Sequence, residues 1–144
     1  MPARKPHEVD LLLHEALLER GDLDAAVALY EQDAVFVVSP NNVVSGHTAI
    51  REILEEMLAA GPTGQLDAVT SVTSVGGTIA VTRTKGNVTS VGPDGKLVSV
   101  PFRSVEVFRR QLDGTWLFVI DDPGGEGVKA IRAEPPVAEG QQPR

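Results

Sequence analysis

The hydrophobic and polar positions of this chain change their period about halfway along it. Over the first sixty residues, apolar side chains recur at steps of three and four, which is the period of an amphipathic helix. They predict helices over about 7–20, over a short segment after Asp22, and over about 46–60. Gly21 ends the first helix, Asp22 caps the second, Ser45 caps the third, and Gly61-Pro62 ends it. Between the second and third helices, the run from Ala34 to Pro40 and the pair Val43-Val44 predict two short strands.

The second half of the chain has the composition and punctuation of long strands. Segments 66–75, 78–91 and 96–109 are rich in Val and Thr, with Gly-rich turns between them. The stretch 102–122, FRSVEVFRRQLDGTWLFVIDD, contains two apolar runs joined at Asp113-Gly114, which is a strong hairpin signal. Helices followed by antiparallel strands predict an α+β fold. Because the last run is apolar on both faces, we expect helices to cover one face and a second subunit to cover the other.

The length of the chain and its composition at the two ends predict a single domain. A chain of 144 residues is long enough for one hydrophobic core. After Asp122 the sequence becomes rich in Pro and Gly. We therefore predict a flexible N-terminus at 1–6, one domain at 7–128, and a flexible tail at 129–144.

Charge and residue usage exclude several functional classes. The net charge of -7 argues against nucleic acid or an anionic membrane as a partner. The absence of cysteine excludes disulfides and thiolate chemistry. No apolar run is long enough to span a bilayer and no secretory signal is recognisable, so a cytoplasmic protein is the default expectation. The three histidines form no metal-binding motif with nearby carboxylates, and we expect neither a metal nor a cofactor.

Three segments, in their order along the chain, resemble a known family. The segments ALLERGDLDAAVALYEQDAVFV, SGHTAIREIL and DGTWLFVIDDP are similar to those of the nuclear transport factor two-like superfamily, in its SnoaL-like and ketosteroid-isomerase-like branch. The chain most resembles the small SgcJ/EcaC-type proteins. The resemblance implies a cone-shaped, curved antiparallel sheet wrapped around about three N-terminal helices, a cystatin-like α+β barrel with an internal pocket. It also implies a homodimer formed through the sheet.

The resemblance does not extend to the catalytic groups of ketosteroid isomerase. Those enzymes use a carboxylate base shortly after the second helix, a tyrosine on the first helix and a second carboxylic acid on a later strand, and two of these three groups have no match here. Here Val37 and Val38 occupy the position of the base, and the first predicted helix has no tyrosine. We therefore do not expect ketosteroid isomerase activity itself.

The two aspartates at the end of the last predicted strand are the first catalytic candidates. Asp121 falls where SnoaL-like cyclases carry an aspartate, and Asp122 faces the opposite side because side chains alternate along a strand. A carboxylate held among apolar side chains has a raised pKa and can act as a general base near neutral pH. The competing interpretation is a carboxylate in water or paired with Arg103.

Glu106 is the third catalytic candidate. It is predicted to share a strand face with Phe102, Ser104 and Phe108, where a charged group needs a partner. Arg103, Arg83 or Lys85 could provide one, which would make Glu106 a structural ion pair instead of a catalytic group.

Four residues are candidates for contact with a ligand. Arg103 could hold a ligand oxygen through its planar guanidinium. Tyr30, predicted at the end of the second helix, could reach the mouth of a pocket, although a core ring with a wetted hydroxyl is the alternative. Phe102 shares the face of Glu106, and Trp116 is either a ligand contact or a core or interface residue.

Two functions remain open at this stage. One is a protein of undetermined activity that binds a small apolar or amphipathic metabolite. The other is an enzyme of the cyclase, isomerase or dehydratase type, with an aspartate base at the end of the last strand. An enzyme requires at least two polar groups that converge on one point in a pocket sheltered from water, whereas a binding module does not.

Overall fold

A computed structural model describes residues 2–61 and 63–125 of the chain. The helical elements precede most of the strands, as the period of the apolar positions predicts. They are α1 (Pro6–His14), a π-helical continuation η1 (Glu15–Glu19), α2 (Leu23–Val27) and α3 (His47–Ala59). The strands are β1 (Tyr30–Ser39), β2 (Asn42–Ser45), β3 (Thr63–Thr73), β4 (Ile79–Val91), β5 (Leu97–Arg110) and β6 (Trp116–Asp122).

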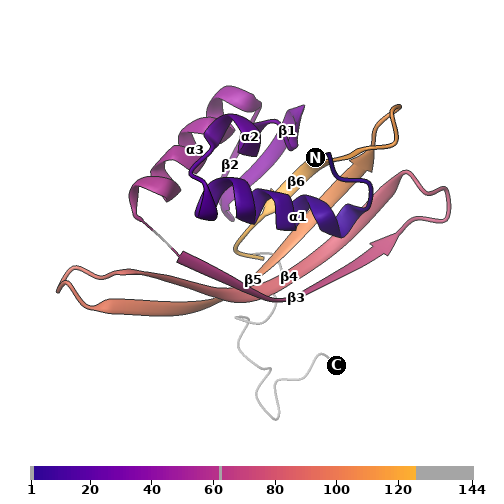
Figure 1. Ribbon diagram of the computed structural model, residues 1–144. Coiled ribbons are helices and arrows are strands. Elements are labelled where there is room, and N and C mark those ends of the chain that lie inside the picture. The colour runs from indigo at the N-terminus through magenta and orange to yellow at the C-terminus, as the bar shows by residue number, and fades with distance from the viewer. Residues whose placement is uncertain (1, 62, 126–144) are drawn as a thin grey trace, which may run out of the picture.

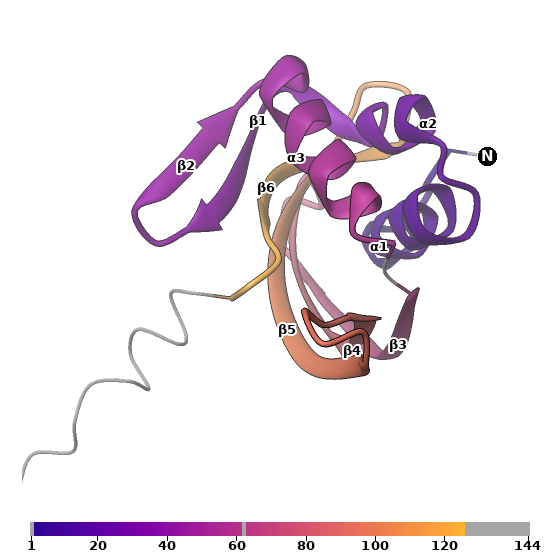
Figure 2. The ribbon, with the colours of Figure 1, turned by 90° about the vertical axis from the view of Figure 1, so that its left-hand side faces the viewer.

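The six strands form one sheet in the order β2-β1-β6-β5-β4-β3. The sheet is strongly curved, and the helices pack on its concave face (Figures 1 and 2). The α+β class is therefore confirmed. The sheet is mixed instead of wholly antiparallel, because β1 pairs in parallel with β6 while the other neighbours are antiparallel.

The Asp113-Gly114 turn joins β5 and β6 as predicted. Gly114 has φ 83°, a left-handed conformation that glycine adopts without steric cost. The Asp113 carboxylate accepts hydrogen bonds from the Thr115 backbone N–H and hydroxyl at 2.9 and 2.6 Å. The turn thus sets the pairing of the two strands that carry Glu106 and Asp121.

Two of the expected helix boundaries are right and two are not. Asp22 caps α2 by accepting a hydrogen bond from Ala25 N at 3.0 Å, and the first helix covers the predicted range if η1 is included. The cap of α3 is Gly46, with φ 90°, and not Ser45, which is the last residue of β2. Tyr30 begins β1 and does not end a helix.

The core lies between the concave face and the helices. Tyr30 stacks on Phe118 with ring centroids 4.4 Å apart, and Phe118 also contacts Phe108 at 4.7 Å. Val9 of α1 and Ile50 of α3 are fully buried. Burial of these side chains is the main force that holds α1 and α3 on the sheet.

The first residues of the chain contact the domain. Ala3 is buried, and its carbonyl accepts a hydrogen bond from Trp116 N at 3.1 Å. The predicted tail at 129–144 lies outside the described residues, and the division of the chain at residues 6 and 128 stays a prediction. No helix in the described part of the chain is long and apolar enough to cross a membrane.

Candidate functional site

A cavity of about 210 Å³ lies between the helices and the concave face of the sheet. We call it the cone pocket. Three carboxyl groups, Asp10, Glu106 and Asp121, line it together with the hydroxyls of Thr84 and Ser104. Most of the remaining lining is apolar, from α1, η1, β1, α3 and the strands: Leu13, Leu17, Leu18, Phe36, Leu54, Met57, Leu66, Val88 and Phe102. The pocket therefore combines apolar walls with one acidic region.

Strand alternation brings Glu106 and Asp121 together. Glu106 points inward between Ser104 and Phe108, and its direct partner on β6 is Asp121. The pairing of β5 with β6 shifts register between Val107 and Phe108, because β6 has one extra residue there. This irregularity changes the parity of β6 beyond Phe118, so that Asp121 and not Asp122 is the buried acid.

The hydroxyl of Tyr30 donates a hydrogen bond to Asp121 Oδ2 at 2.5 Å. Both side chains are buried, and the Tyr30 ring is fixed by its stack on Phe118. A short bond to a carboxylate oxygen is among the stronger hydrogen bonds in proteins. Tyr30 therefore holds one oxygen of Asp121 in place and leaves the other oxygen of that carboxyl group for different contacts.

Asp10 and Glu106 are less well satisfied than Asp121. The Thr84 hydroxyl donates to Glu106 Oε2 at 3.5 Å, a long bond. Asp10 Oδ2 is buried and has no hydrogen-bond partner. A buried polar atom without a partner costs free energy, and in a native fold it calls for an explanation.

Burial is the largest cause that raises the pKa values of all three acids, and the charges of neighbouring carboxylates, Asp122 in the case of Asp121, raise them further. Burial, followed by the charge of Asp121, raises the pKa of Asp10 to about 8. Burial, followed by the charges of Asp10 and Asp121, raises the pKa of Glu106 to about 10. Burial also raises the pKa of Asp121 to about 7, although the hydrogen bond from Tyr30 works in the opposite direction. At neutral pH this acid cluster therefore retains protons.

No lysine or arginine lines the cone pocket in the described part of the chain. The basic side chain that lines the pocket is that of His14, which is half-buried. Its Nε2 lies 3.9 Å from Glu19 Oε1. The predicted ion pairs of Glu106 with Arg103, Arg83 or Lys85, and of Asp121 with Arg103, are wrong. Those cations belong to the alternate positions of β4 and β5, which face the other side of the sheet.

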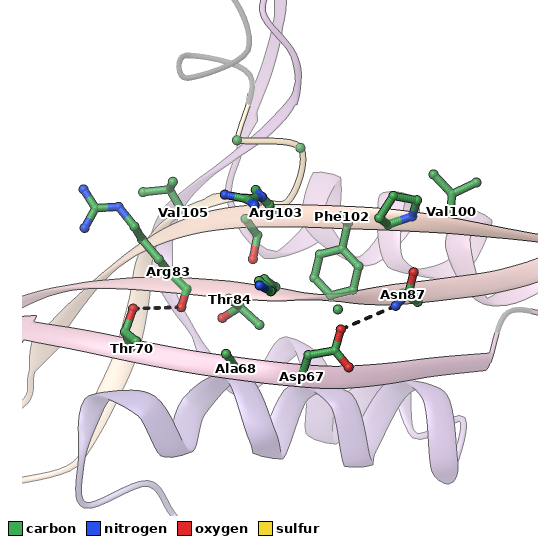
Figure 3. Close-up of a pocket in the computed structure, with 16 residues that line it drawn as sticks. Asp67, Ala68, Thr70, Arg83, Thr84, Asn87, Val100, Phe102, Arg103 and Val105 are labelled. Carbon is green, nitrogen blue, oxygen red and sulfur yellow. Dashed lines mark hydrogen bonds between the residues drawn. The ribbon is translucent and has the colours of Figure 1, made fainter. Parts of the chain in front are cut away.

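The cations line a separate groove of about 660 Å³ on the convex face of the sheet (Figure 3). Arg83, Lys85 and Arg103 lie there with Val100 and Val105. Lys85 and Arg103 are direct partners across β4 and β5. Arg103 is thus placed away from the acid cluster and lies outside the cone pocket.

The structure brings together some of the predicted site residues and separates others. Asp121, Glu106 and Phe102 line the cone pocket, and Tyr30 is bonded to Asp121. Trp116 is 5% exposed and belongs to the core, away from the pocket lining. Asp122 is only partly buried and does not line the pocket either.

Asp10 is the site residue that the sequence reasoning missed. It lies three, four and seven residues before Leu13, His14 and Leu17, and all four line the pocket. An acid at this spacing on the apolar face of a predicted helix is the signal that could have identified it. Within the described residues, no group of three His, Asp or Glu side chains is arranged to hold a metal ion.

The sequence from residue 12 to residue 119 matches the family model of the SnoaL-like domain. The chain belongs to the SnoaL-like domain family. Its sheet curved around helices and its internal pocket agree with that membership. No curated protein matches the sequence.

Solved structures with the same fold carry several different names. A calcium/calmodulin-dependent protein kinase II association domain from Xanthomonas campestris, provisionally so assigned, is 27% identical and has a TM-score of 0.66 over 80% of this chain and 83% of that one. A provisionally assigned dehydratase of the NTF2-like family from Streptomyces avermitilis is 21% identical, with a TM-score of 0.67 over 80% and 90%. A provisionally assigned ketosteroid isomerase from Shewanella frigidimarina is 16% identical, with a TM-score of 0.68 over 79% and 90%. This variety of names means that function must be argued from the site.

Among the described lining residues, the pocket also lacks two of the three ketosteroid isomerase groups. Neither Val37 nor Val38 lines it, and α1 contributes Asp10 and His14 in place of a tyrosine. The acids of this pocket must therefore be assigned roles from their own environment.

Proposed function

We propose that this SnoaL-like protein binds a small, largely apolar molecule in the cone pocket and catalyses proton transfer on it, as an isomerase, cyclase or dehydratase does. The observation that carries the proposal is the acid cluster, in which three carboxyl groups of unequal pKa meet in an apolar cavity. Pairs of acids whose environments separate their pKa values are a mark of general acid–base catalysis.

Asp121 is the general base in this proposal. Its pKa of about 7 leaves a substantial fraction ionised at neutral pH, and yet makes it a stronger base than an exposed aspartate. It removes a proton from a carbon next to a carbonyl group. The electron pair of the C–H bond then forms the carbon–carbon double bond of an enolate, and the π pair of the C=O bond moves onto the oxygen. Tyr30 acts as a positioning residue, because its hydroxyl fixes one oxygen of the base.

Asp10 and Glu106 stabilise the oxygen on which charge develops. With pKa values of about 8 and about 10, both retain a proton at neutral pH and can donate hydrogen bonds. A preorganised donor of this kind contributes roughly 3–4 kcal/mol to transition-state stabilisation. The proton on Asp121 then returns to the substrate, either at another carbon or on a leaving hydroxyl group.

Binding without catalysis is the second candidate function. The apolar walls of the cone pocket favour it, since they suit a hydrophobic ligand whether or not a reaction follows. The two candidates differ in one measurable consequence. An enzyme exchanges a carbon-bound proton of its ligand with solvent, and a binding protein does not.

The experiment measures deuterium incorporation into acetophenone and other enolisable single-ring ketones by NMR in deuterated buffer. Wild-type protein is expected to accelerate the exchange above the buffer rate, and Asp121→Asn to abolish that acceleration. Asp67→Asn is the control, because it makes the same chemical change at an exposed position of β3 that does not line the cone pocket, and it should retain the wild-type rate. Binding without accelerated exchange would favour the non-catalytic function.

We also propose that the protein forms a homodimer through the convex face of the sheet. That face presents exposed or half-exposed apolar side chains: Val72, Val81, Val105, Val107 and Ile120. Charges of both signs surround them, including Arg83, Arg103 and Asp67. An apolar centre with mixed charges at its edge supports association of two copies.

A further inference from the structure

We propose that the cone pocket accepts uncharged molecules about the size of one substituted ring, that Asp10 contacts their polar group, and that anionic compounds are rejected. This inference rests on the proposed function, because it describes the substrate of the same site. It goes further in assigning Asp10 a contact with the ligand and in excluding large and anionic substrates.

The volume of the pocket sets the size of the ligand. An apolar cavity of about 150 Å³ holds benzene, and pockets for drug-sized ligands measure about 300–1,000 Å³. At about 210 Å³, the cone pocket lies between these values. It has room for a ring with a short substituent, or for a chain of similar size. A four-ring steroid exceeds it.

The lining of the pocket sets the charge of the ligand. Three carboxyl groups line it, and the described residues supply no lysine or arginine to balance a ligand anion. The titratable groups that face Asp10 are Glu106 of β5, Asp121 of β6, Tyr30 of β1 and, one turn along α1, His14. The hydroxyl of Thr84 on β4 also faces the Asp10 carboxyl group, and its hydrogen bond lowers the pKa of Asp10. A carboxylate or phosphate here would lose its hydration beside these acids, so its burial is strongly unfavourable.

The unpartnered oxygen of Asp10 indicates where the polar group of the ligand lies. Asp10 is 8% exposed, its Oδ2 has no protein partner, and the residue lines the pocket. A carbonyl or hydroxyl oxygen of a ligand can satisfy this carboxyl group. The apolar part of the ligand then contacts the apolar lining, which includes Phe36, Leu54 and Leu66.

A neutral ligand suits this cluster better than an ammonium ion. Because the acids retain protons at neutral pH, a neutral acceptor finds hydrogen-bond donors already in place. An ammonium ion offers only donors and pairs best with an ionised carboxylate, so its binding favours the release of protons from the cluster. Affinity for a cation would therefore rise with pH, and affinity for a neutral carbonyl compound would fall.

The test compares four compounds by NMR titration: acetophenone, benzoate, benzylamine and a four-ring steroid ketone. At about pH 6, where Asp10 is protonated, we expect acetophenone to bind at least about tenfold more tightly than the other three. Its affinity should fall as the pH rises from about 6 to about 9, because ionised Asp10 no longer donates. Binding is measured separately from deuterium exchange, so bound acetophenone without exchange would count against catalysis alone.

Asp10→Asn tests the assigned contact. Asparagine has a similar shape and keeps a donor at every pH, so this variant should lose the step in acetophenone affinity near pH 8. Asp67→Asn, an exposed residue of β3 in the convex groove, is the matched control and should retain it. Thermal unfolding of each variant verifies that it is folded, and Asp10→Thr, which also removes the ionisable group, should lose the step if Asp10→Asn does not fold.

Several results would overturn the inference. These are equal or tighter binding of benzoate, benzylamine or the steroid, and no binding of acetophenone at millimolar concentration. Persistence of the pH step in Asp10→Asn, or in Asp10→Thr where Asp10→Asn does not fold, would remove Asp10 from the contact.

Discussion

Glu106 is the residue whose ionisation most affects the stability of the fold. It is 3% exposed, and its pKa of about 10 lies well above the usual value for a glutamate. The folded protein therefore holds a proton on Glu106 that the unfolded chain releases above about pH 4. Between about pH 4 and pH 10 the folded state therefore binds more protons than the unfolded chain. The contribution of Glu106 to the free energy of unfolding is fully present below about pH 4 and declines as the pH rises toward 10.

We predict that the free energy of unfolding decreases from about pH 6 to pH 9 and that Glu106→Gln reduces this dependence. Each group that holds an extra proton in the folded state contributes a slope of about 1.4 kcal/mol per pH unit. Urea unfolding at several pH values measures the slope. Glu55→Gln, an exposed glutamate of α3, is the control and should leave it unchanged. A wild-type stability that does not vary over this range would contradict the raised pKa values.

The orientation of a residue could be predicted from the sequence only where the local pattern alone determines it. The inward orientation of Glu106 follows from alternation with Ser104 and Phe108. Alternation does not predict which of Asp121 and Asp122 points inward, since the extra residue in β6 reverses the alternation. Asp10 was missed because its importance arises from tertiary contacts with β5 and β6, which the helical pattern does not contain.

At the scale of elements, the central feature is the close packing of β3 on β4 near the pocket. Gly86 of β4 pairs with Leu66 of β3 and Phe102 of β5, beside an irregularity between Leu66 and Ala68. A Cβ atom on Gly86 would lie 2.1 Å from Gln65 O and 3.0 Å from the Phe102 ring. A glycine at this position allows the backbones to approach each other where the sheet bends.

We predict that Gly86→Ala destabilises the protein by about 1–3 kcal/mol, because β3 must move away from β4. Gly76→Ala is the matched control: its Cβ atom meets nothing within 4 Å, and its effect should lie within about 0.5 kcal/mol. Chemical unfolding measures the change in the free energy of unfolding for both variants. Equal stabilities of the two variants would mean that the close approach is not required.

Helices and strands were the most predictable level of the structure. The periods of apolar residues gave the three helical segments and the long strands, and Asp113-Gly114 gave the last hairpin. The parallel pairing of β1 with β6 was not predicted. It joins segments about ninety residues apart, and no local turn signal specifies such a pairing.

At the scale of the whole molecule, the two faces of the sheet differ in what covers them. Helices α1 and α3 cover the concave face, whereas the described part of the chain places no helix on the convex face (Figure 2). The apolar valines there are the proposed dimer contact, which agrees with the sequence-based expectation that a second subunit covers the last strands. The described structure contains one copy, and the dimer stays a proposal.

We predict that the protein elutes as a dimer in size-exclusion chromatography with light scattering. Val105→Glu places a charge at the centre of the convex face and should shift the protein toward monomer. Val75→Glu, in the exposed turn between β3 and β4, is the control and should leave the protein dimeric. A wild-type protein that is monomeric at all concentrations tested would rule out the dimer.

The proposed proton transfer requires above all that the acid cluster retains protons at neutral pH. Carbon-13 NMR of the side-chain carboxyl groups, titrated with pH, measures this directly for Asp10, Glu106 and Asp121. We predict midpoints of about 8, about 10 and about 7, in that order. If all three carboxyl groups titrate near about 4, as exposed acids do, the cluster is fully ionised at neutral pH and the proposed proton transfer has no basis.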